Sequence, residues 1–207
     1  MSLLTTWGYT LTETDTLADL LNVDEYNNMT GGKYAGMPEQ VAAALKASSM
    51  SIRSFVGWHL APSLACELKT TFFDRRVTRI GGDVQIQLPA RYVTDITSVT
   101  IGGVEHDRFV LDPTGLLWVI GVCGGERFTE VDVIYTAGLP DGMMAAIKEV
   151  AAHGVTHAVA VPAGITSEAS GGVSVTYNAN WINNSRATGL TEGVKELLIP
   201  YRVQGVF

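Results

Sequence analysis

Charged residues are scarce in this chain. Asp, Glu, Lys and Arg make up 17% of its 207 residues, whereas they make up about a quarter of typical soluble domains. Hydrophobic residues reach 46%, which is enough for a packed core and excludes intrinsic disorder for most of the chain. Because so little charge is left for the surface, we expect other molecules, such as further copies of the chain, to cover part of it.

An excess of basic residues is also lacking. The chain has 14 Lys and Arg against 21 Asp and Glu, a net charge of −7, so its overall charge does not favour binding to phosphate groups. An acidic protein is still compatible with lining a nucleic-acid channel, because repulsion lets the strand slide without sticking. One basic cluster exists, formed by Arg75, Arg76 and Arg79 in a predicted loop between two strands. It is either a solvated loop tip or a contact for an acidic partner.

Paired cysteines and long apolar runs are missing too. Cys66 and Cys123 are isolated in the sequence, which favours buried thiols in a reducing compartment over a disulfide or a metal site. The first residues lack the basic and apolar regions of a secretory signal. No apolar run reaches the length of about 18 residues that predicts a membrane span. We therefore expect no membrane partner.

Motifs for catalysis are not found either. The sequence has no nucleophile elbow, phosphate-binding loop or dinucleotide fingerprint. His153 and His157 have the spacing of two metal ligands on a helix, but Gly154 stands where a zinc protease carries Glu, and no third ligand is evident. We expect His157 to face the core and His153 to pair with Glu149. The sequence therefore predicts no enzyme, no cofactor and no metal.

What the chain does have is a change in the spacing of its apolar residues. Val41, Leu45 and Ile52 recur on one helical face after Pro38, which suits a first turn. From residue 66 to 136 the period becomes two, in about six short runs separated by glycine turns, which predicts an antiparallel β-meander. A second long helix and a short C-terminal one follow.

These elements predict an α+β fold, in which a small bundle of two long helices and a C-terminal helix carries the inserted β-meander. The main domain is expected at residues 38–207, with helical parts at 38–60 and 141–207. Residues 1–37 are expected to form an N-terminal extension, in which a short helix begins at Asp15 and a polar loop follows. 

Several apolar side chains have predicted positions. Ile52 and Ile147 lie on the apolar faces of the two long helices, so both are expected to be buried. Trp118 lies in the apolar run LLWVIG and is also expected in the core. Trp181 stands in a loop of asparagines, where an aromatic residue is either an interface anchor or packs back on its own domain.

The C-terminal segment is a second candidate interface. A free helix of about nine residues is marginal in water, so the segment either packs on its own domain or becomes ordered on a partner. Its apolar, aromatic end favours the partner, and removal of residues 200–207 is then expected to leave folding intact. The candidate contact residues are Leu190, Val194, Leu197, Leu198, Tyr201, Arg202, Val203 and Phe207.

Four stretches of the sequence, in the right order between Glu39 and Arg202, resemble a known family. The family is the head-to-tail connector, or adaptor, proteins of long-tailed bacteriophages, in the variety common among phages of actinobacteria. Residues 1–36 fall outside the pattern, and Pro200 interrupts the closing helix. The stretches are SIRSFVGWHLAPS, LPARYVTDITSVTIGGV, VDVIYTAGLP and VPAGITSEASGGVSVTYN.

The resemblance implies a structural virion protein, made in the host cytoplasm and placed at the head–tail interface. Copies would form a homo-oligomeric ring, usually of twelve subunits, below the portal protein. The ring would extend the DNA channel, through which double-stranded DNA passes without sequence-specific binding, and offer a platform to the next connector or tail protein. The C-terminal helix and tail commonly dock on the portal, which gives residues 190–207 the role of portal-docking candidates here.

Three other functions stay open from the sequence. One is a stopper or tail-completion ring protein of the same particle, a class that tends to be more purely β. Another is a β-rich glycan-binding module, for which Trp118 and Trp181 would be the candidate residues. The third is a small hydrolase whose site is not visible in the sequence.

Overall fold

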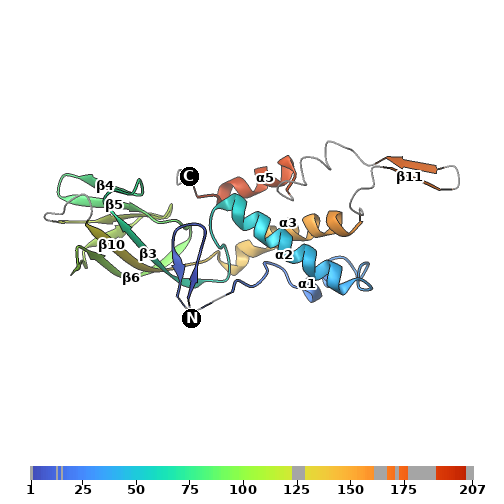
Figure 1. Ribbon diagram of the computed structural model, residues 1–207, viewed down its shortest axis with the longest axis horizontal. Helices are drawn as coiled ribbons and strands as arrows, with labels where there is room; N and C mark the ends of the chain where they lie inside the picture. The colour runs from blue at the N-terminus through green and yellow to red at the C-terminus, as the bar shows by residue number, and fades with distance from the viewer. Residues whose placement is uncertain are drawn as a thin grey trace. The chain divides into compact units, whose positions relative to one another are not determined.

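The computed structural model describes residues 2–12, 14, 16–122, 129–160, 167–170, 173–176 and 190–203 (Figure 1). The chain divides into two compact units. The first, here the β-unit, comprises Met1–Ala18, Gly57–Asp141 and Tyr201–Phe207. The second, the helical unit, comprises Asp19–Val56 and Gly142–Pro200.

The β-unit contains two antiparallel sheets with the orders β1-β2-β3-β10-β6-β7 and β4-β5-β9-β8. The six-stranded sheet consists of β1 (Leu3–Leu4), β2 (Thr10–Leu11), β3 (Leu64–Thr71), β6 (Val93–Ile101), β7 (Val104–Glu105) and β10 (Glu130–Ala137). The four-stranded sheet consists of β4 (Val77–Ile80), β5 (Asp83–Gln87), β8 (Phe109–Leu111) and β9 (Leu116–Val119).

The core of the β-unit lies between the two sheets. On β10, Val131, Val133 and Tyr135 are buried, and the residues between them are more exposed. On β9, Leu117 and Val119 are buried in the same alternating way. Since successive side chains of a strand point to opposite faces, each sheet turns its apolar face to the other, and each has an outward face (Figure 1).

The predicted α+β class is confirmed, but the strands do not form a single meander. β3 pairs with β10 over its whole length, from Leu64↔Ala137 to Thr71↔Glu130, although the two strands are far apart in the sequence. The segments between them contribute to both sheets. Apolar periodicity shows which residues of a strand face the core, but it does not show which strand lies beside it, and for this reason the sheet order was not predicted.

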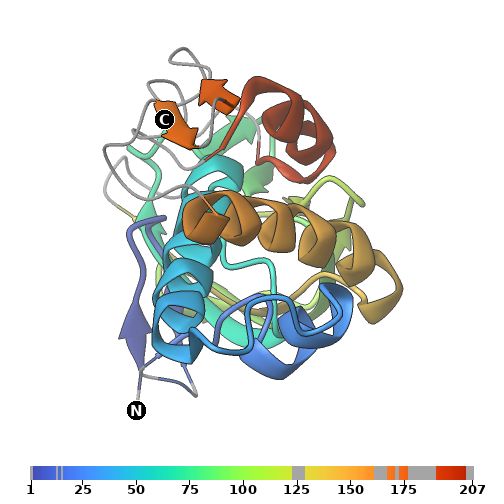
Figure 2. The same ribbon diagram turned by 90° about the vertical axis from the view of Figure 1, so that its right-hand side faces the viewer.

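The helical unit is built from two long helices, α2 (Pro38–Val56) and α3 (Asp141–Ala160), which pack on each other (Figure 2). The Ser48 hydroxyl on α2 donates to the Ala151 carbonyl on α3 at 3.3 Å. Ile52 and Ile147 are both 0% exposed, as predicted. The unit also contains α1 (Val23–Met29), α5 (Glu192–Leu198) and the hairpin of β11 (Ser167–Ser170) and β12 (Val173–Thr176). The 3-10 turn η1 (Ile199–Tyr201) follows α5.

Residues 1–37 are not a separate extension. The β1–β2 hairpin joins the six-stranded sheet through β3, and α1 belongs to the helical unit. The short helix begins at Val23 rather than at Asp15, which lies outside the described residues. Its N-cap is Asn22, whose side-chain oxygen accepts from the Glu25 N–H at 2.8 Å, while the Glu25 carboxylate accepts from the Asn22 N–H at 3.1 Å. This capping box was present in the sequence, inside a stretch whose polarity indicated a loop.

We expect Ile52→Ala or Ile147→Ala to lower the free energy of unfolding by about 2–5 kcal/mol, because each truncation leaves a cavity in a fully buried site. Urea denaturation followed by circular dichroism measures this. Met50→Ala is the control, since Met50 is on α2 but 62% exposed, and it should change the free energy by less than about 0.5 kcal/mol. Equal effects of the three changes would contradict the helix packing described above.

Candidate interface surfaces

The C-terminal segment begins as a capped and partly buried helix. Thr191 is the N-cap of α5, and its hydroxyl oxygen accepts from the Val194 N–H at 3.4 Å. Leu190 and Leu198 are buried at 1% and 0% exposure. The cap and these two buried leucines fix α5 to its own chain.

The residues after α5 are bound to the β-unit. The Trp58 indole N–H donates to the Tyr201 carbonyl at 2.8 Å, and the Arg91 guanidinium donates to the Arg202 carbonyl at 3.4 Å. Val203 is 3% exposed. The tail up to Val203 therefore packs on its own chain, which corrects the expectation that it becomes ordered only on a partner.

This burial changes the set of docking candidates. Leu190, Leu198 and Val203 are buried against their own chain and so have no free surface to offer. Val194 and Tyr201 are half-buried, Arg202 is exposed, and Phe207 lies outside the described residues. Removing residues 200–207 would delete the acceptor of the Trp58 N–H and the buried Val203, so we now expect it to destabilise the fold, contrary to the sequence-based prediction.

Two large apolar side chains of this segment point away from the protein's interior. Leu197 is 64% exposed and Ile199 is 54% exposed. Leu197 was predicted as a contact residue, whereas Ile199 was missed because Pro200 indicated the end of the helix at that point. The chain instead continues into the turn η1, and Ile199 is the first residue after α5. We call these two residues the C-terminal apolar pair.

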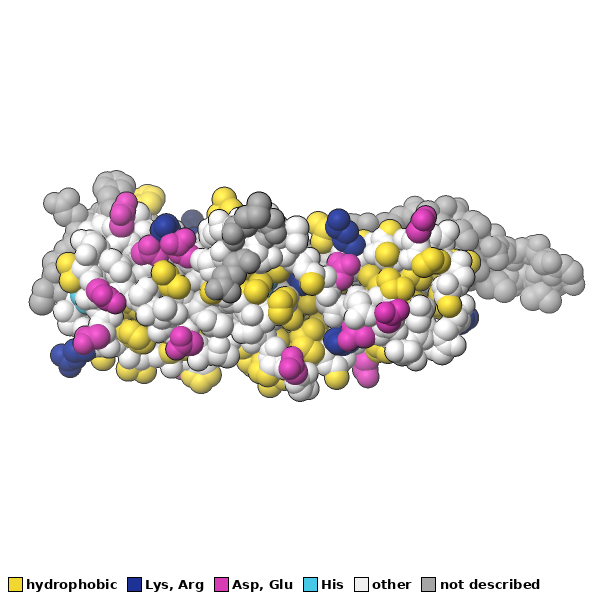
Figure 3. Space-filling view, turned by 90° about the horizontal axis from the view of Figure 1, so that it is seen from below, with side chains coloured by type: hydrophobic (Ala, Val, Ile, Leu, Met, Phe, Trp, Pro, Cys, Tyr) yellow, Lys and Arg dark blue, Asp and Glu magenta, His cyan; other side chains and the backbone are white. Residues whose placement is uncertain are grey.

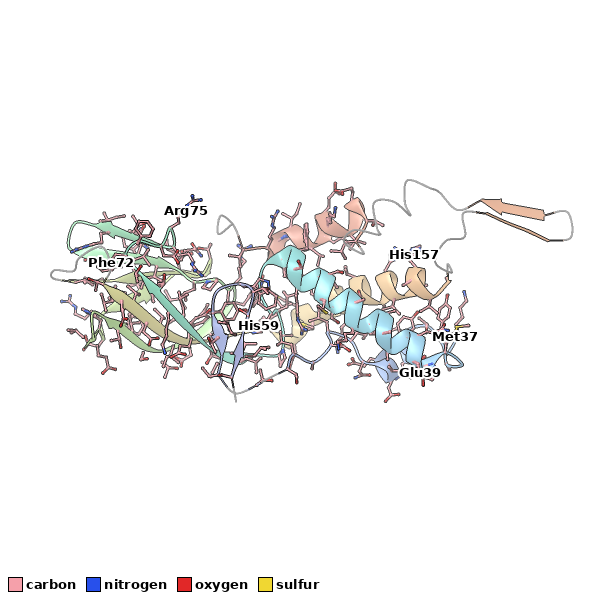
Figure 4. The ribbon with its side chains drawn as sticks, in the orientation of Figure 1. Met37, Glu39, His59, Phe72, Arg75 and His157 are labelled. Carbon is pink, nitrogen blue, oxygen red and sulfur yellow. The ribbon has the colours of Figure 1, made fainter. Side chains whose placement is uncertain are left out.

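The three arginines of the basic cluster have different surroundings. Arg76 forms a hydrogen-bonded ion pair with Asp74, in which Nη2 and Nε lie 2.9 Å and 3.1 Å from the carboxylate oxygens. The Arg79 guanidinium lies over the Phe72 ring at 5.4 Å. Arg75 is exposed and points away from the strands (Figure 4). Of the three, Arg75 is therefore the clearest candidate for a contact with another molecule.

The Asp74–Arg76 pair predicts an acid-sensitive contribution to stability. Burial by itself would raise the pKa of Asp74, but hydrogen bonds from Arg76 and Thr70 outweigh it and lower that pKa to about 2. Because this value is below that of the unfolded chain, the contribution is complete above about pH 4 and is lost as the pH falls towards 2. Asp74→Asn should cost about 1 kcal/mol at pH 6, allowing for solvent screening, and markedly less at pH 2.

Urea denaturation at both pH values tests this prediction. Arg75→Ala is the control, because it changes a neighbouring exposed residue that does not bond Asp74. If Asp74→Asn lowered the free energy of unfolding equally at pH 6 and pH 2, the contribution of Asp74 to stability would not depend on its negative charge.

Trp118 is not in the core. It alternates on β9 with the buried Leu117 and Val119 and is half-buried on the outward face of the four-stranded sheet. It pairs across the sheet with Gln85 on β5 and with Val110 on β8, which is 57% exposed. The sequence misled here because every residue of LLWV is apolar, so no alternation showed which side chains point out. The other candidate tryptophan, Trp181, lies outside the described residues.

The histidines and the described cysteine do not form a catalytic group. His59 is buried, with Nε2 2.9 Å from the Ala137 carbonyl and Nδ1 2.8 Å from the Tyr9 hydroxyl (Figure 4). Since the carbonyl can only accept, Nε2 carries the proton and the Tyr9 hydroxyl donates to Nδ1. Burial raises the pKa of the Cys66 thiol to about 12, which makes it unreactive; Cys123 is not described.

The His153 and His157 rings lie 4.4 Å apart on α3. His153 therefore lies beside His157. The side chain of His157 is half-buried, whereas the sequence predicted that it faces the core. Burial, followed by the charge of His153, lowers the pKa of His157. Within the described part of the chain, no group of three or more metal-ligating side chains comes together, and no helix is long and apolar enough to cross a membrane.

Comparison of the sequence with protein-family models gives no match, and none of the curated proteins matches it. The surfaces described above therefore carry the functional argument.

Proposed function

We propose that this chain is a structural subunit of a bacteriophage head-to-tail connector. Copies form a ring, with twelve as the usual number in the family it resembles, between the portal protein and the next connector or tail protein. The ring extends the channel through which double-stranded DNA passes. The subunit acts by binding other proteins and carries out no reaction.

The C-terminal apolar pair is the observation that carries this proposal. Leu197 and Ile199 are both more than half exposed and lie two residues apart on a segment that is otherwise fixed to its own chain, and grouped exposed apolar side chains mark interaction sites. A fixed segment with exposed apolar side chains is suited to dock on a partner, because little conformational entropy is lost on binding. In the family that the chain resembles, this segment is the one that docks on the portal.

Other exposed apolar side chains of the helical unit support a role in assembly. They would need to be covered in a ring, since each copy contacts two neighbours. Figure 3 views the molecule from below and shows apolar side chains gathered on the part that the helices form. The large exposed ones are Met29, Met37, Met50 and Met143.

The test uses the portal protein encoded in the same genome, on phage heads that lack a connector. Wild-type chain should attach to these heads and appear as a ring below the portal in electron micrographs. Leu197→Asp with Ile199→Asp should reduce attachment by about a hundredfold or more, because two charges would be placed against an apolar site. Val104→Asp is the control, since Val104 is 60% exposed but lies on β7.

Two results would overturn the proposal. In one, the wild-type chain does not attach to heads bearing the portal. In the other, the doubly substituted chain attaches as well as the wild type while circular dichroism shows both to be folded, which would remove the C-terminal apolar pair from the docking surface.

A stopper or tail-completion ring protein is the second candidate function. The β-unit favours it more than the sequence did, because the strands form two sheets rather than one small meander. The same experiment separates the two functions. A chain that attaches only to heads already carrying another connector, and not to the portal alone, is a stopper.

A further inference from the structure

The two outward faces of the β-unit differ in charge. On the six-stranded sheet, Asp132 on β10 pairs with Lys69 on β3 and with Thr100 on β6, and Thr100 pairs with Glu105 on β7. Residues paired directly across a sheet point to the same side. Asp132 alternates with the buried Val131 and Val133, so this row faces outward.

Further carboxylates share this side. Glu67 pairs with Ile134, which has the same outward alternation as Asp132, and Asp95 pairs with Thr136. We call the five carboxylates of this side the acidic face: Glu67, Asp95, Glu105, Glu130 and Asp132. Figure 3 looks onto the molecule from below, and Asp and Glu side chains are spread over the part that the strands form.

A single lysine does not neutralise the acidic face. Lys69 lies 2.8 Å from the Glu67 carboxylate and 3.9 Å from that of Asp132. Burial and then the carboxylates of Glu67 and Glu130 raise the pKa of Asp132. Negative charges are thus crowded on this sheet, and a positively charged partner would relieve their repulsion.

The outward face of the four-stranded sheet has large apolar side chains among polar ones, and Asp83, which pairs with Ile80, is the one carboxylate on its four strands. A row of paired residues runs across it, from Thr78 on β4 through Gln85 and Trp118 to Val110 on β8. Ile80, 49% exposed, stands on the same side of β4. We call these five residues the Trp118 face.

Exposed arginines lie beside the Trp118 face. Arg75 is in the turn before β4, and Arg108 directly precedes β8, so they stand at the two edges of the sheet. Both side chains are exposed. An apolar centre with arginines at its rim is a common composition for a protein interface.

We infer that the acidic face of one copy binds the Trp118 face and its arginines on the next copy. The faces lie on the two outward sides of two sheets that share one core, as an interface between unlike surfaces in a closed ring requires. The carboxylates of the acidic face on one copy are opposite in charge to Arg75 and Arg108 on the next copy, so the two faces attract each other. This inference rests on the proposed ring.

Charge reversal provides the test. The acidic-face variant carries Glu105→Lys and Glu130→Lys, both at exposed positions. The arginine variant carries Arg75→Glu and Arg108→Glu. Each variant alone places like charges across every contact, so ring formation on portal-bearing heads should fall by about tenfold or more. Native mass spectrometry and electron microscopy measure the assembled fraction.

Mixing the two variants in equal amounts should restore the ring. In an alternating ring of even number, reversed faces meet reversed faces and native faces meet native faces, so every contact is again between opposite charges. Native mass spectra should then show both chains in equal numbers. The control is Asp19→Lys with Asp24→Lys, at exposed positions outside both faces, which changes the net charge as much as the acidic-face variant and should leave assembly unchanged.

The outcomes separate this inference from the function on which it rests. If the wild type forms no ring on portal-bearing heads, the proposed function fails and the inference with it. If the wild type assembles and folded single variants also assemble fully, or their mixture does not restore the ring, the inference alone is overturned. An acidic-face variant that assembles but impairs passage of DNA would place that face in the channel, which also overturns it.

Discussion

Gly138→Ala is expected to lower the free energy of unfolding by about 3–5 kcal/mol, because the new methyl group would collide with backbone atoms. A Cβ at this position would lie 2.3 Å from the Ser63 Cα and 2.7 Å from the Ser63 nitrogen. Backbone atoms cannot swing aside as the end of a flexible side chain can. The Gly138 N–H also donates to the Tyr92 carbonyl at 3.2 Å, so the segment cannot move away without losing this bond.

Gly142→Ala is the matched control for this substitution. Gly142 lies in the first turn of α3, and a Cβ there would meet no atom within 4 Å. Alanine is the better helix former by up to about 1 kcal/mol, so this change should leave stability unaltered or raise it. Urea denaturation of both variants measures the difference. If Gly138→Ala were as stable as Gly142→Ala, the close approach of the segment after β10 to Ser63 would be wrong.

Trp58→Ala is expected to cost about 3–5 kcal/mol, because it removes one of the largest fully buried side chains. The indole packs with two aromatic rings, at centroid distances of 6.3 Å from Tyr92 and 5.6 Å from His59. It also binds the tail through its N–H, which donates to the Tyr201 carbonyl. The substitution should therefore both weaken the β-unit and release the chain after η1.

Trp58→Phe separates these two effects. Phenylalanine keeps most of the buried ring but lacks the N–H donor, so the cost should fall to about 1–3 kcal/mol, and the loss should concentrate at the tail. Hydrogen exchange at Arg202 and Val203 measures the release of the tail, and urea denaturation measures the total. Unchanged exchange in both variants would show that Trp58 does not hold the C-terminal segment.

Much of the local structure was predictable from the sequence. The spacing of apolar residues indicated both long helices, and Ile52 and Ile147 are buried as that spacing required. Alternation and glycine turns indicated the strands of the β-insertion. The capping box Asn22–Glu25 was also visible in the sequence, but the polarity around it led to the prediction of a loop. These are local signals, in which a residue's neighbours in the chain are its neighbours in space.

The candidate surfaces were less predictable. The C-terminal segment could be singled out as an amphipathic end, but its anchors, the Trp58 indole and the burial of Val203, depend on residues distant in the sequence. Trp118 shows the same limit, because an all-apolar strand does not indicate its outward side. The acidic face depends on pairings such as Asp132 with Thr100 and Thr100 with Glu105, and no pattern within one strand predicts these.

By itself the sequence determined the α+β fold class, the two long helices, the many short strands and the shortage of charge. Each of these depends on composition or on the spacing of neighbouring residues. Only the tertiary structure decided that β3 lies beside β10, that residues 1–37 are divided between two units, and which apolar side chains remain exposed. These features depend on which segments meet, and the free energy of such contacts comes from burial summed over distant parts of the chain. Leu198 and Leu197 are adjacent and chemically identical, yet one is buried at 0% and the other is 64% exposed. Tertiary packing makes that difference, and with it decides which of the two is free to bind another protein.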